Sequence, residues 1–356
     1  MRSAIALVTA IGVALGAALA SPSSATQNSG EQAVVVAVLD TGITAHPDVG
    51  WRLTKNGVGR PSGAVLPGYD FVSDPWVAAD GDGWDPDPSD RGDGVKPREA
   101  ADRASCRSRV SSWHGTNVAG TIAARGSAQD DSLGIAPSAS ILPVRIMGRC
   151  GGNTADVAAG LLWAVGEPIP DVPRNPHPAQ IVNVSLSGTT SRCPRPLQTA
   201  IDVARERGAI IVAAAGSSAQ NTATSTPANC AGVISVAAVD RAGQRSPTSN
   251  FGSEITLSAL GGDMSTGEKN GILTTTNTGR YRPRDPALGY YQGSSAAAAR
   301  VSGALAVLAA RNPGADTGAL TSLLLAATTP FASGQCDAGD GNCGVGILDL
   351  ERLLAG

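Results

Sequence analysis

The sequence predicts an α/β protein with a mainly parallel central sheet that is covered by helices on both faces. Short, unbroken apolar runs alternate along the chain with longer runs of helical period. Such runs are typical of parallel strands that are buried on both faces by the helices connecting them. Because no repeat, low-complexity linker or change of composition interrupts the alternation, we expect one domain over residues 33–356.

The individual elements follow from local patterns. Each expected strand is a short apolar run, and each expected helix carries apolar residues at helical spacing. The expected strands are Val34–Leu39, Gly68–Asp74, Ile141–Met147, Gln180–Gly188, Ala209–Gly216 and Gly232–Asp240, with shorter ones near Ile255–Leu260 and Gly271–Thr275. The expected helices begin near His114, cover Thr154–Val165 and Leu197–Gly208, follow Gly293, and cover Leu320–Ala327. Ligands of such sheets bind at the carboxyl ends of the strands. Asp40, Ser185–Gly188 and Gly216–Ser217 lie at such ends.

Composition and charge argue against two kinds of partner. The chain has 356 residues, of which 16% are charged, and a net charge of −3 at pH 7. This small negative charge gives no reason to expect a nucleic acid or an anionic membrane surface as partner. Beyond the N-terminal region no stretch is apolar enough to cross a bilayer. We expect a monomer that forms no stable association with membranes.

The N-terminus has the form of a secretory signal peptide. Arg2 precedes an apolar run from Ala4 to Ala20, and the run ends in an A-x-A cleavage pattern. The alternative is a membrane anchor, but the run is short for a span and no stop-transfer pattern follows it. We predict a signal peptide over residues 1–20, a short N-terminal segment over 21–32, and secretion to the periplasm or the extracellular space.

A nucleophilic serine is suggested by the stretch GSSAAAARVSG, Gly293–Gly303. Its Gly-Ser-Ser turn runs into an alanine-rich helical pattern, which places a serine at a helix N-terminus. Free backbone N–H groups and the positive end of the helix dipole favour a developing negative charge there. This suits a nucleophile that contributes to an oxyanion hole. Taken alone, the stretch is better explained by an N-cap serine, so partners are needed.

Two other stretches supply those partners. Asp40 ends the apolar run VVVAVL and opens the motif DTGI, and His114 opens the run HGTNVAGT. Asp, His and Ser in this chain order are the triad order of subtilisin. Since DTGI, HGTNVAG and GSSAAAARVSG match its three motifs, the chain resembles the subtilases, the subtilisin-like serine peptidases, from about Val34 to about Leu350. It is similar in particular to the disulfide-bearing extracellular subtilases of bacteria. The resemblance implies the subtilisin-like three-layer fold.

The resemblance also implies catalytic roles. Ser295 matches the nucleophile, His114 the general base, and Asp40 the carboxylate that orients the imidazole. The residues alone leave plainer alternatives open, a turn aspartate at Asp40 and a helix-opening residue without function at His114. A second Asp-Thr-Gly begins at Asp316, as an aspartic peptidase would need. Asp316 precedes a helical run instead of ending a strand, so we interpret it as an N-cap.

The oxyanion hole is where the chain departs most from the family. Subtilases have an asparagine where this chain has Ser217. The N–H of Ser295 and the hydroxyl of Ser294 are the other expected donors. Because serine is shorter than asparagine by an amide group, we expect a competent triad with reduced turnover. Ala299 and Arg300 also replace the proline and histidine that follow the family's serine.

Peptide recognition in subtilases is β-augmentation, in which the substrate lies as an extra strand between two edges. The resemblance implies that these edges are Gly148–Gly152 and Ser185–Gly188. The residues predicted to contact substrate are Gly148, Gly151, Gly152, Ser185, Leu186, Ser187, Gly188 and Gly216. Because main-chain hydrogen bonds do not distinguish substrate side chains, we expect broad specificity. Ser187, where the family has glycine, is expected to narrow the range of side chains that the primary pocket accepts. The alternative is that the glycines serve only turns.

Six aspartates crowd the loop AADGDGWDPDPSDRGD, at positions 80, 82, 85, 87, 90 and 93. Oxygen ligands spaced by glycines suit Ca²⁺, although the helices and closing glutamate of an EF-hand are absent. The alternative is a solvated acidic loop without a metal. Calcium-stabilised loops occur in related subtilases, and we predict a structural Ca²⁺ bound by Asp80, Asp82, Asp90 and Asp93.

The six cysteines of an exported chain suggest disulfides, although spacing alone does not choose their connectivity. A zinc site is disfavoured because the chain has no C-x-x-C and only three histidines. We favour pairing in chain order: Cys106–Cys150, Cys193–Cys230 and Cys336–Cys343. The last pair flanks a short loop rich in glycine, whereas the first two rest on the resemblance.

Two functions from different classes remain. The first is a secreted serine endopeptidase that acts on protein or peptide substrates. The second is a pseudo-peptidase, a subtilase scaffold that binds peptides or a partner but cleaves little, as Ser217, Ala299 and Arg300 suggest. We favour the enzyme because a complete triad supports residual catalysis even beside a weakened oxyanion hole.

Overall fold

Nine strands form one sheet at the centre of the computed structural model, which describes residues 33–53, 59–61, 64–103, 106–126, 134–336 and 343–355. All neighbouring strands are parallel except the outermost pair, β14 and β15, so the predicted mainly parallel sheet is confirmed. The strand order is β14 (Thr328–Thr329), β15 (Ile347–Leu348), β11 (Leu257–Leu260), β10 (Ile234–Val239), β8 (Ile210–Ala214), β6 (Ile181–Val184), β1 (Val35–Asp40), β5 (Ser140–Arg145) and β4 (Tyr69–Asp70).

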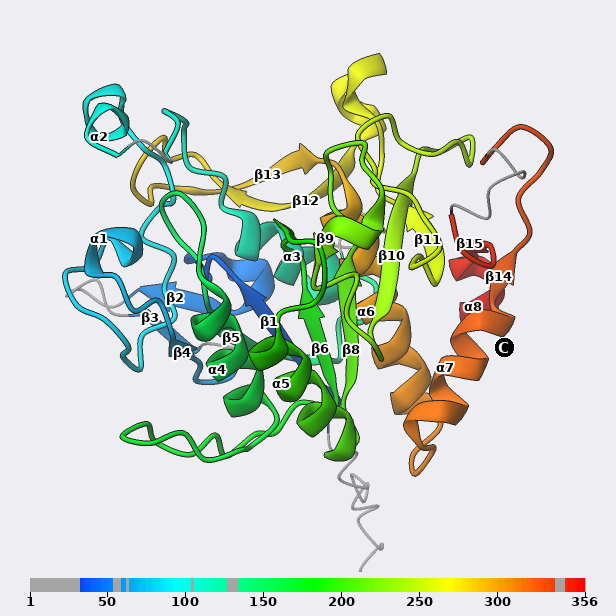
Figure 1. Ribbon diagram of the computed structural model, residues 1–356, viewed down its shortest axis with the longest axis horizontal. Coiled ribbons are helices and arrows are strands. Elements are labelled where there is room, and N and C mark those ends of the chain that lie inside the picture. The colour runs from blue at the N-terminus through cyan, green and yellow to red at the C-terminus, as the bar shows by residue number, and fades with distance from the viewer. Residues whose placement is uncertain are drawn as a thin grey trace, which may run out of the picture. The chain divides into compact units, whose positions relative to one another are not determined.

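Helices cover both faces of this sheet, as Figure 1 shows. One face is covered by α3 (His114–Ala123) and α6 (Ser294–Arg311), with α7 (Thr317–Ala326) packed against α6. The other face is covered by α4 (Thr154–Ala164) and α5 (Arg195–Glu206). The three layers confirm the predicted subtilisin-like architecture. Shorter helices are α1 (Pro75–Ala78), α2 (Pro97–Ala101) and α8 (Leu350–Ala355).

The two faces of β1 explain why its sequence is an unbroken apolar run. Val36 and Val38 belong to the hydrophobic core under α3 and α6, whereas Ala37 and Leu39 belong to the core under α4 and α5. Successive side chains of a strand point to opposite faces, so a strand covered on both sides needs apolar residues throughout. The polar residue Asp40 follows at once, where the strand reaches the edge of the sheet.

Some expected elements differ in extent. The stretch Gly68–Asp74 contains only the two-residue strand β4, and Gln180–Gly188 divides into β6 and β7 (Gly188–Thr189). An antiparallel hairpin of β12 (Ile272–Asn277) and β13 (Pro286–Tyr291) lies where we expected one short strand. The second strand of the hairpin was missed because it contains proline and glycine, which are rare in strands. The remaining short strands are β2 (Trp51–Leu53), β3 (Gly59–Pro61) and β9 (Ser225–Thr226).

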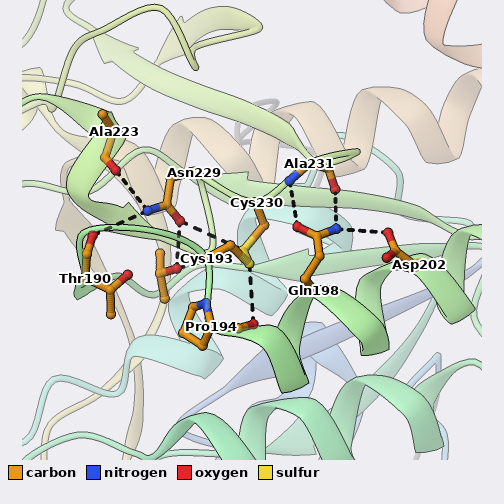
Figure 2. The surroundings of a disulfide bond; sticks show 10 residues. Thr190, Cys193, Pro194, Gln198, Asp202, Ala223, Asn229, Cys230 and Ala231 are labelled. Carbon is orange, nitrogen blue, oxygen red and sulfur yellow. Dashed lines mark hydrogen bonds between the residues drawn. A yellow bond between two sulfur atoms is a disulfide. The ribbon is translucent and has the colours of Figure 1, made fainter.

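The three predicted disulfides are confirmed. Cys106–Cys150, Cys193–Cys230 and Cys336–Cys343 are all bonded. Figure 2 shows the second bond beside the side chain of Gln198, which donates to Ala231 O at 3.1 Å and accepts from Ala231 N at 2.9 Å. These contacts fasten the loop that follows β9 to the start of α5.

Residues of the predicted signal peptide and of the segment 21–32 lie outside the described part of the chain. Within the described part, no helix combines the length and the apolar character that crossing a bilayer would require. The predicted N-cap is confirmed, since the Asp316 side chain accepts from Ala319 N at the start of α7, at 2.7 Å.

Candidate active site

Asp40 and His114 form a hydrogen-bonded pair at the carboxyl edge of the sheet. Asp40 is the last residue of β1 and is fully buried, and His114 is the first residue of α3. Nδ1 of His114 lies 2.8 and 2.9 Å from the two carboxylate oxygens of Asp40. Because a carboxylate only accepts, Nδ1 carries the hydrogen and Nε2 is left as the basic nitrogen. The imidazole is 25% exposed, so a substrate has access to it.

Thr41 connects the end of β1, which carries Asp40, to the start of α3, which carries His114. Its N–H donates to Asp40 Oδ1 at 2.7 Å, and its hydroxyl accepts from Gly115 N at 3.0 Å and donates to Asp90 Oδ2 at 2.8 Å. A Cβ at Gly115 would lie 2.1 Å from the carbonyl oxygen of Gly42, so only glycine permits this approach. Burial raises the pKa of Asp90 to about 7, and the charge of Asp93 adds to the effect.

The environment of His114 favours its protonated form. Burial by itself lowers the pKa of His114, but the charge and hydrogen bond of Asp40 outweigh burial, so the pKa is raised. The charges of Asp93 and Asp90 act in the same direction. Tyr291 packs edge-on against the imidazole with the ring centroids 6.4 Å apart. An imidazolium formed during a reaction would therefore be stabilised where it stands.

Ser295 is the second residue of α6, directly after the turn at Gly293. Its hydroxyl donates to the carbonyl oxygen of Ser185 at 3.0 Å, and within the described residues no hydrogen bond joins it to His114. Catalytic hydrogen bonds are often long or misaligned in the absence of substrate. The structure thus joins Asp40 to His114 directly and holds Ser295 against the edge that follows β6.

Ser217 and Ser294 form a hydroxyl pair beside the N-terminus of α6. Their Oγ atoms lie 3.2 Å apart, Ser294 N donates to Ser217 Oγ at 3.4 Å, and Gly216 N donates to Ser294 Oγ at 3.0 Å. Gly293 has a φ of 120°, and a Cβ there would lie 2.9 Å from Ser217 Oγ, so both conformation and space require glycine. The N–H of Ser295 has no partner among the described residues, which leaves it available to an oxyanion.

The two predicted substrate edges follow the strands on either side of β1. Gly148–Gly152 follows β5, and Ser185–Gly188 follows β6. Gly148 and Gly151 bridge to each other in antiparallel fashion, at 3.0 and 3.2 Å between N and O atoms. Ser185 is buried, Leu186 is partly buried, and Ser187 and Gly188 are exposed. Gly152 also lies on the first edge, and Gly216 lies just beyond β8.

The structure divides the acidic residues into separate groups. In one group, ligand oxygens of Asp70, Asp80 and Asp85 lie within 4.8 Å of one another. Buried Arg145 donates through Nη1 to Asp70 at 2.5 Å and to Asp80 at 2.6 Å. Asp80 Oδ1 is buried without a hydrogen-bond partner in the described chain. Three carboxylates and one guanidinium leave two negative charges when all are ionised. The orphaned oxygen and the excess charge therefore fit a divalent cation that prefers oxygen ligands.

The other predicted metal ligands are engaged elsewhere or stand apart. Asp90 accepts from Thr41 and Gly92, and Asp93 accepts from Ser112 and pairs with Arg109 at 2.9 Å. Asp82 is exposed. The structure therefore does not bring Asp80, Asp82, Asp90 and Asp93 together. It joins Asp80 instead to Asp85 and to Asp70, which we had assigned only to a strand.

Comparison with known proteins decides the family. The profile of Peptidase S8, described as the subtilase family, matches residues 31–346. The chain belongs to the subtilase family. Among curated proteins it is 40% identical over 320 residues to an extracellular protease of Xanthomonas campestris, and 38% identical over 328 residues to an extracellular basic protease of Dichelobacter nodosus. These alignments cover 90% and 91% of this chain but 51% and 50% of the relatives, so the chain spans about half their length.

A solved protease structure agrees with the fold. Over 91% of this chain and 90% of the other, the structure of a protease from Pseudoalteromonas arctica superposes with a TM-score of 0.80 and 39% identity. A cold-adapted subtilisin-like serine proteinase covers 90% of each chain, with a TM-score of 0.61 and 24% identity, which supports the fold alone.

The sequence analysis did not identify several residues that support the site, either because the subtilase motifs do not indicate them or because the indication was overlooked. Thr41 stands inside the aspartate motif, and its position next to Asp40 could have suggested a supporting role. Asp90 was predicted to be a metal ligand. Its contact with Thr41 has no sequence signal, because that contact depends on how a long loop folds. Tyr291 was missed because the strand that carries it was not predicted.

Proposed function

We propose that the chain is a secreted serine endopeptidase that hydrolyses peptide bonds in proteins through an acyl-enzyme intermediate. The observation that carries the proposal is the hydrogen bond between the buried Asp40 carboxylate and Nδ1 of His114. It is supported by Ser295, which stands at the N-terminus of α6 with its N–H unpaired among the described residues. Together they supply a charge-stabilising carboxylate, a base and a nucleophile at one edge of the sheet.

In the proposed reaction, the Ser295 hydroxyl turns from Ser185 toward His114 as substrate binds. Nε2 of His114 accepts the hydroxyl proton while Oγ attacks the scissile carbonyl carbon, and Asp40 stabilises the imidazolium that forms. His114 then gives the proton to the leaving amine. Water, deprotonated in turn by His114, hydrolyses the acyl-enzyme and releases Ser295.

The oxyanion of the tetrahedral intermediate would be bound by the Ser295 N–H and by a hydroxyl of the Ser217–Ser294 pair. In this pair one hydroxyl donates to the other, so only one hydroxyl hydrogen is left for the oxyanion. We therefore propose a slower enzyme than a subtilase that has asparagine at the position of Ser217.

The substrate is proposed to be an extended peptide that adds a strand between Gly148–Gly152 and Ser185–Gly188. Main-chain hydrogen bonds in such pairing do not distinguish side chains, so the substrate class is broad: unfolded or flexible protein segments. The exposed Ser187 hydroxyl lies on the second of these segments, and it is proposed to narrow the range of substrate side chains that are accepted there.

The proposal has three further parts. A structural Ca²⁺ is bound by Asp70, Asp80 and Asp85, where the ion stabilises the loop and takes no part in bond cleavage. Residues 1–20 direct secretion, which agrees with the names of the relatives as extracellular proteases. The mature chain acts as a monomer.

A pseudo-peptidase is the second candidate, and one observation favours it: the Ser295 hydroxyl bonds to Ser185 instead of His114. A fluorophosphonate probe and casein separate the two, with Ser295→Ala as the control and Ca²⁺ present. Labelling of Ser295 and casein hydrolysis, both lost in Ser295→Ala, would establish the endopeptidase. Absence of labelling and hydrolysis in the folded wild-type chain would leave the binding scaffold.

A further inference from the structure

A cavity of about 440 Å³ lies beside α6, between the β12–β13 hairpin and α8. This volume is within the range of pockets that hold small molecules. Three cations line it, Arg241, Lys269 and Arg300, and no acidic residue does. Much of the remaining wall is apolar, with Leu260, Ile272, Leu273, Leu350 and Leu354. The cavity therefore combines concentrated positive charge with an apolar wall.

The cations of this cavity have no anionic partner within the described chain. Arg241 donates only to the carbonyl oxygen of Gly271, at 3.5 Å, while Arg300 and Lys269 form no hydrogen bond or ion pair with any described residue. Burial lowers the pKa of the partly buried Arg300, the Tyr291 phenol raises it, and the like charge of Arg241 lowers it further. Arg300 is partly buried, whereas Arg241 and Lys269 are exposed, so an anion that enters the cavity meets three like charges, one of them partly withdrawn from water, and no carboxylate lines the wall.

We propose that this cavity binds an organic carboxylate that carries an apolar chain. The carboxylate lies among Arg241, Lys269 and Arg300, since planar guanidinium groups match carboxylate oxygens well. The chain covers the leucine and isoleucine side chains. A small inorganic anion would satisfy the cations but leave the apolar wall in contact with water. Two sources provide this chemistry, a free fatty acid of medium length and the C-terminal residues of a peptide.

The proposed site is close to the catalytic residues but separate from them. Arg300 lies on the same helix as Ser295, and Tyr290, which lines the cavity, precedes the tyrosine that packs against His114. None of the proposed triad residues lines the cavity. Binding can therefore be measured in a chain that has no peptidase activity.

The test is calorimetric titration of the Ser295→Ala chain, which cannot degrade itself or a peptide. The probes are decanoate, N-acetyl-Leu-Leu with a free carboxylate, the amide of the same dipeptide, and inorganic phosphate. We expect one site for decanoate or for the free dipeptide, and whichever binds more tightly identifies the source. The amide and phosphate should bind about tenfold more weakly or not at all, because each lacks one half of the required chemistry.

Variants locate the site. Arg300→Gln should weaken binding about ten- to a hundredfold, as expected for one charge-assisted contact, and Arg300→Lys, which keeps the charge but loses the planar guanidinium, should restore part of it. Lys269→Gln changes an exposed residue and keeps the test decisive even if Arg300→Gln fails to fold. The matched control is Arg195→Gln, an exposed arginine on α5, which should bind like the parent. The proposal is overturned if neither carboxylate binds, if phosphate binds as tightly, or if Lys269→Gln and the control bind alike.

Discussion

Ser295 and Ser185 are joined by a reciprocal pair of hydrogen bonds. The Ser295 hydroxyl donates to the main-chain carbonyl of Ser185 at 3.0 Å, and the Ser185 hydroxyl donates to the main-chain carbonyl of Ser295 at 3.1 Å. The Ser185 hydroxyl in turn accepts from Asn183 at 2.8 Å, and Asn183 accepts from Ser302 at 2.9 Å. This chain of polar groups fastens α6, which carries Ser295, to β6 and to the proposed substrate edge that follows it.

The first prediction concerns this pair. Ser185→Ala removes the hydroxyl but keeps the carbonyl, so the backbone of Ser295 loses one anchor. We expect the free energy of unfolding to fall by about 0.5–1.5 kcal/mol and kcat to fall about two- to tenfold with little change in KM. Urea denaturation and steady-state kinetics measure both. The control is Ser191→Ala, an exposed serine just beyond β7 and outside the proposed site. An equal loss of kcat and stability in both variants would contradict a special role for Ser185.

The second prediction is the pH dependence of activity. His114 acts as a base only when it is neutral, and its pKa is raised above the ordinary value of 6.5. The acid limb of kcat/KM should therefore lie above pH 6.5, with activity falling as pH drops through the raised pKa. Asp40→Asn removes the charge that raises it, so the limb should move to lower pH while kcat falls by about 10⁴. A limb that stays in place in Asp40→Asn would show that Asp40 does not set this pKa.

The third prediction concerns the oxyanion hole. Ser217→Asn adds an amide donor that reaches farther from the backbone than the serine hydroxyl. We expect kcat to rise by about tenfold or more, but by less than the 10²–10³ that one such donor contributes in subtilisin, because the hydroxyl pair already supplies one hydrogen. The matched change at the next exposed serine, Ser218→Asn, should have no effect. An unchanged or lower kcat in Ser217→Asn would mean that the Ser217–Ser294 hydroxyl pair already serves the oxyanion.

The fourth prediction concerns calcium. Removal of Ca²⁺ with a chelator should lower the melting temperature, since an ion bound only by the folded chain at about 100 times its Kd adds about 2.7 kcal/mol. Asp80→Asn should strongly reduce this calcium-dependent shift, because it removes the negative charge of the residue with the unpaired buried oxygen. Asp82→Asn is the control, because Asp82 is exposed and lies outside the group. A melting temperature that stays the same after the chelator is added would argue against a structural ion.

Much of the fold could be predicted because its signals are local. The apolar run that ends at Asp40 shows both the strand and its two buried faces, and the alternation of such runs with helices dictates a parallel sheet. The ends of short strands such as β4, and the whole of β13, depend on tertiary partners. Proline and glycine in β13 are acceptable because that strand pairs with β12 outside the main sheet.

The candidate site could be anticipated only where its signals are equally local. The motifs indicated Asp40, His114 and Ser295 because each occupies an element end with characteristic neighbours. The acidic loop was harder, since nothing in the spacing of its aspartates shows which of them meet Arg145. That buried guanidinium, on β5, gathers Asp70 and Asp80 from separate parts of the chain, and no local pattern encodes such a contact.

Two of the disulfides fasten the segments between which a peptide is proposed to lie. Cys150 lies within the first edge, Gly148–Gly152. Cys230 follows β9, and β9 pairs with β7, the strand that begins directly after Ser187 on the second edge. Such bonds form in oxidising compartments and are rare where thiols are kept reduced. Before these bonds form, a newly made chain would carry its proposed catalytic residues beside substrate edges that no disulfide fastens. If the chain is secreted as proposed, both substrate edges would be fastened only in an oxidising compartment, and the proposed peptidase activity would stay low inside the producing cell.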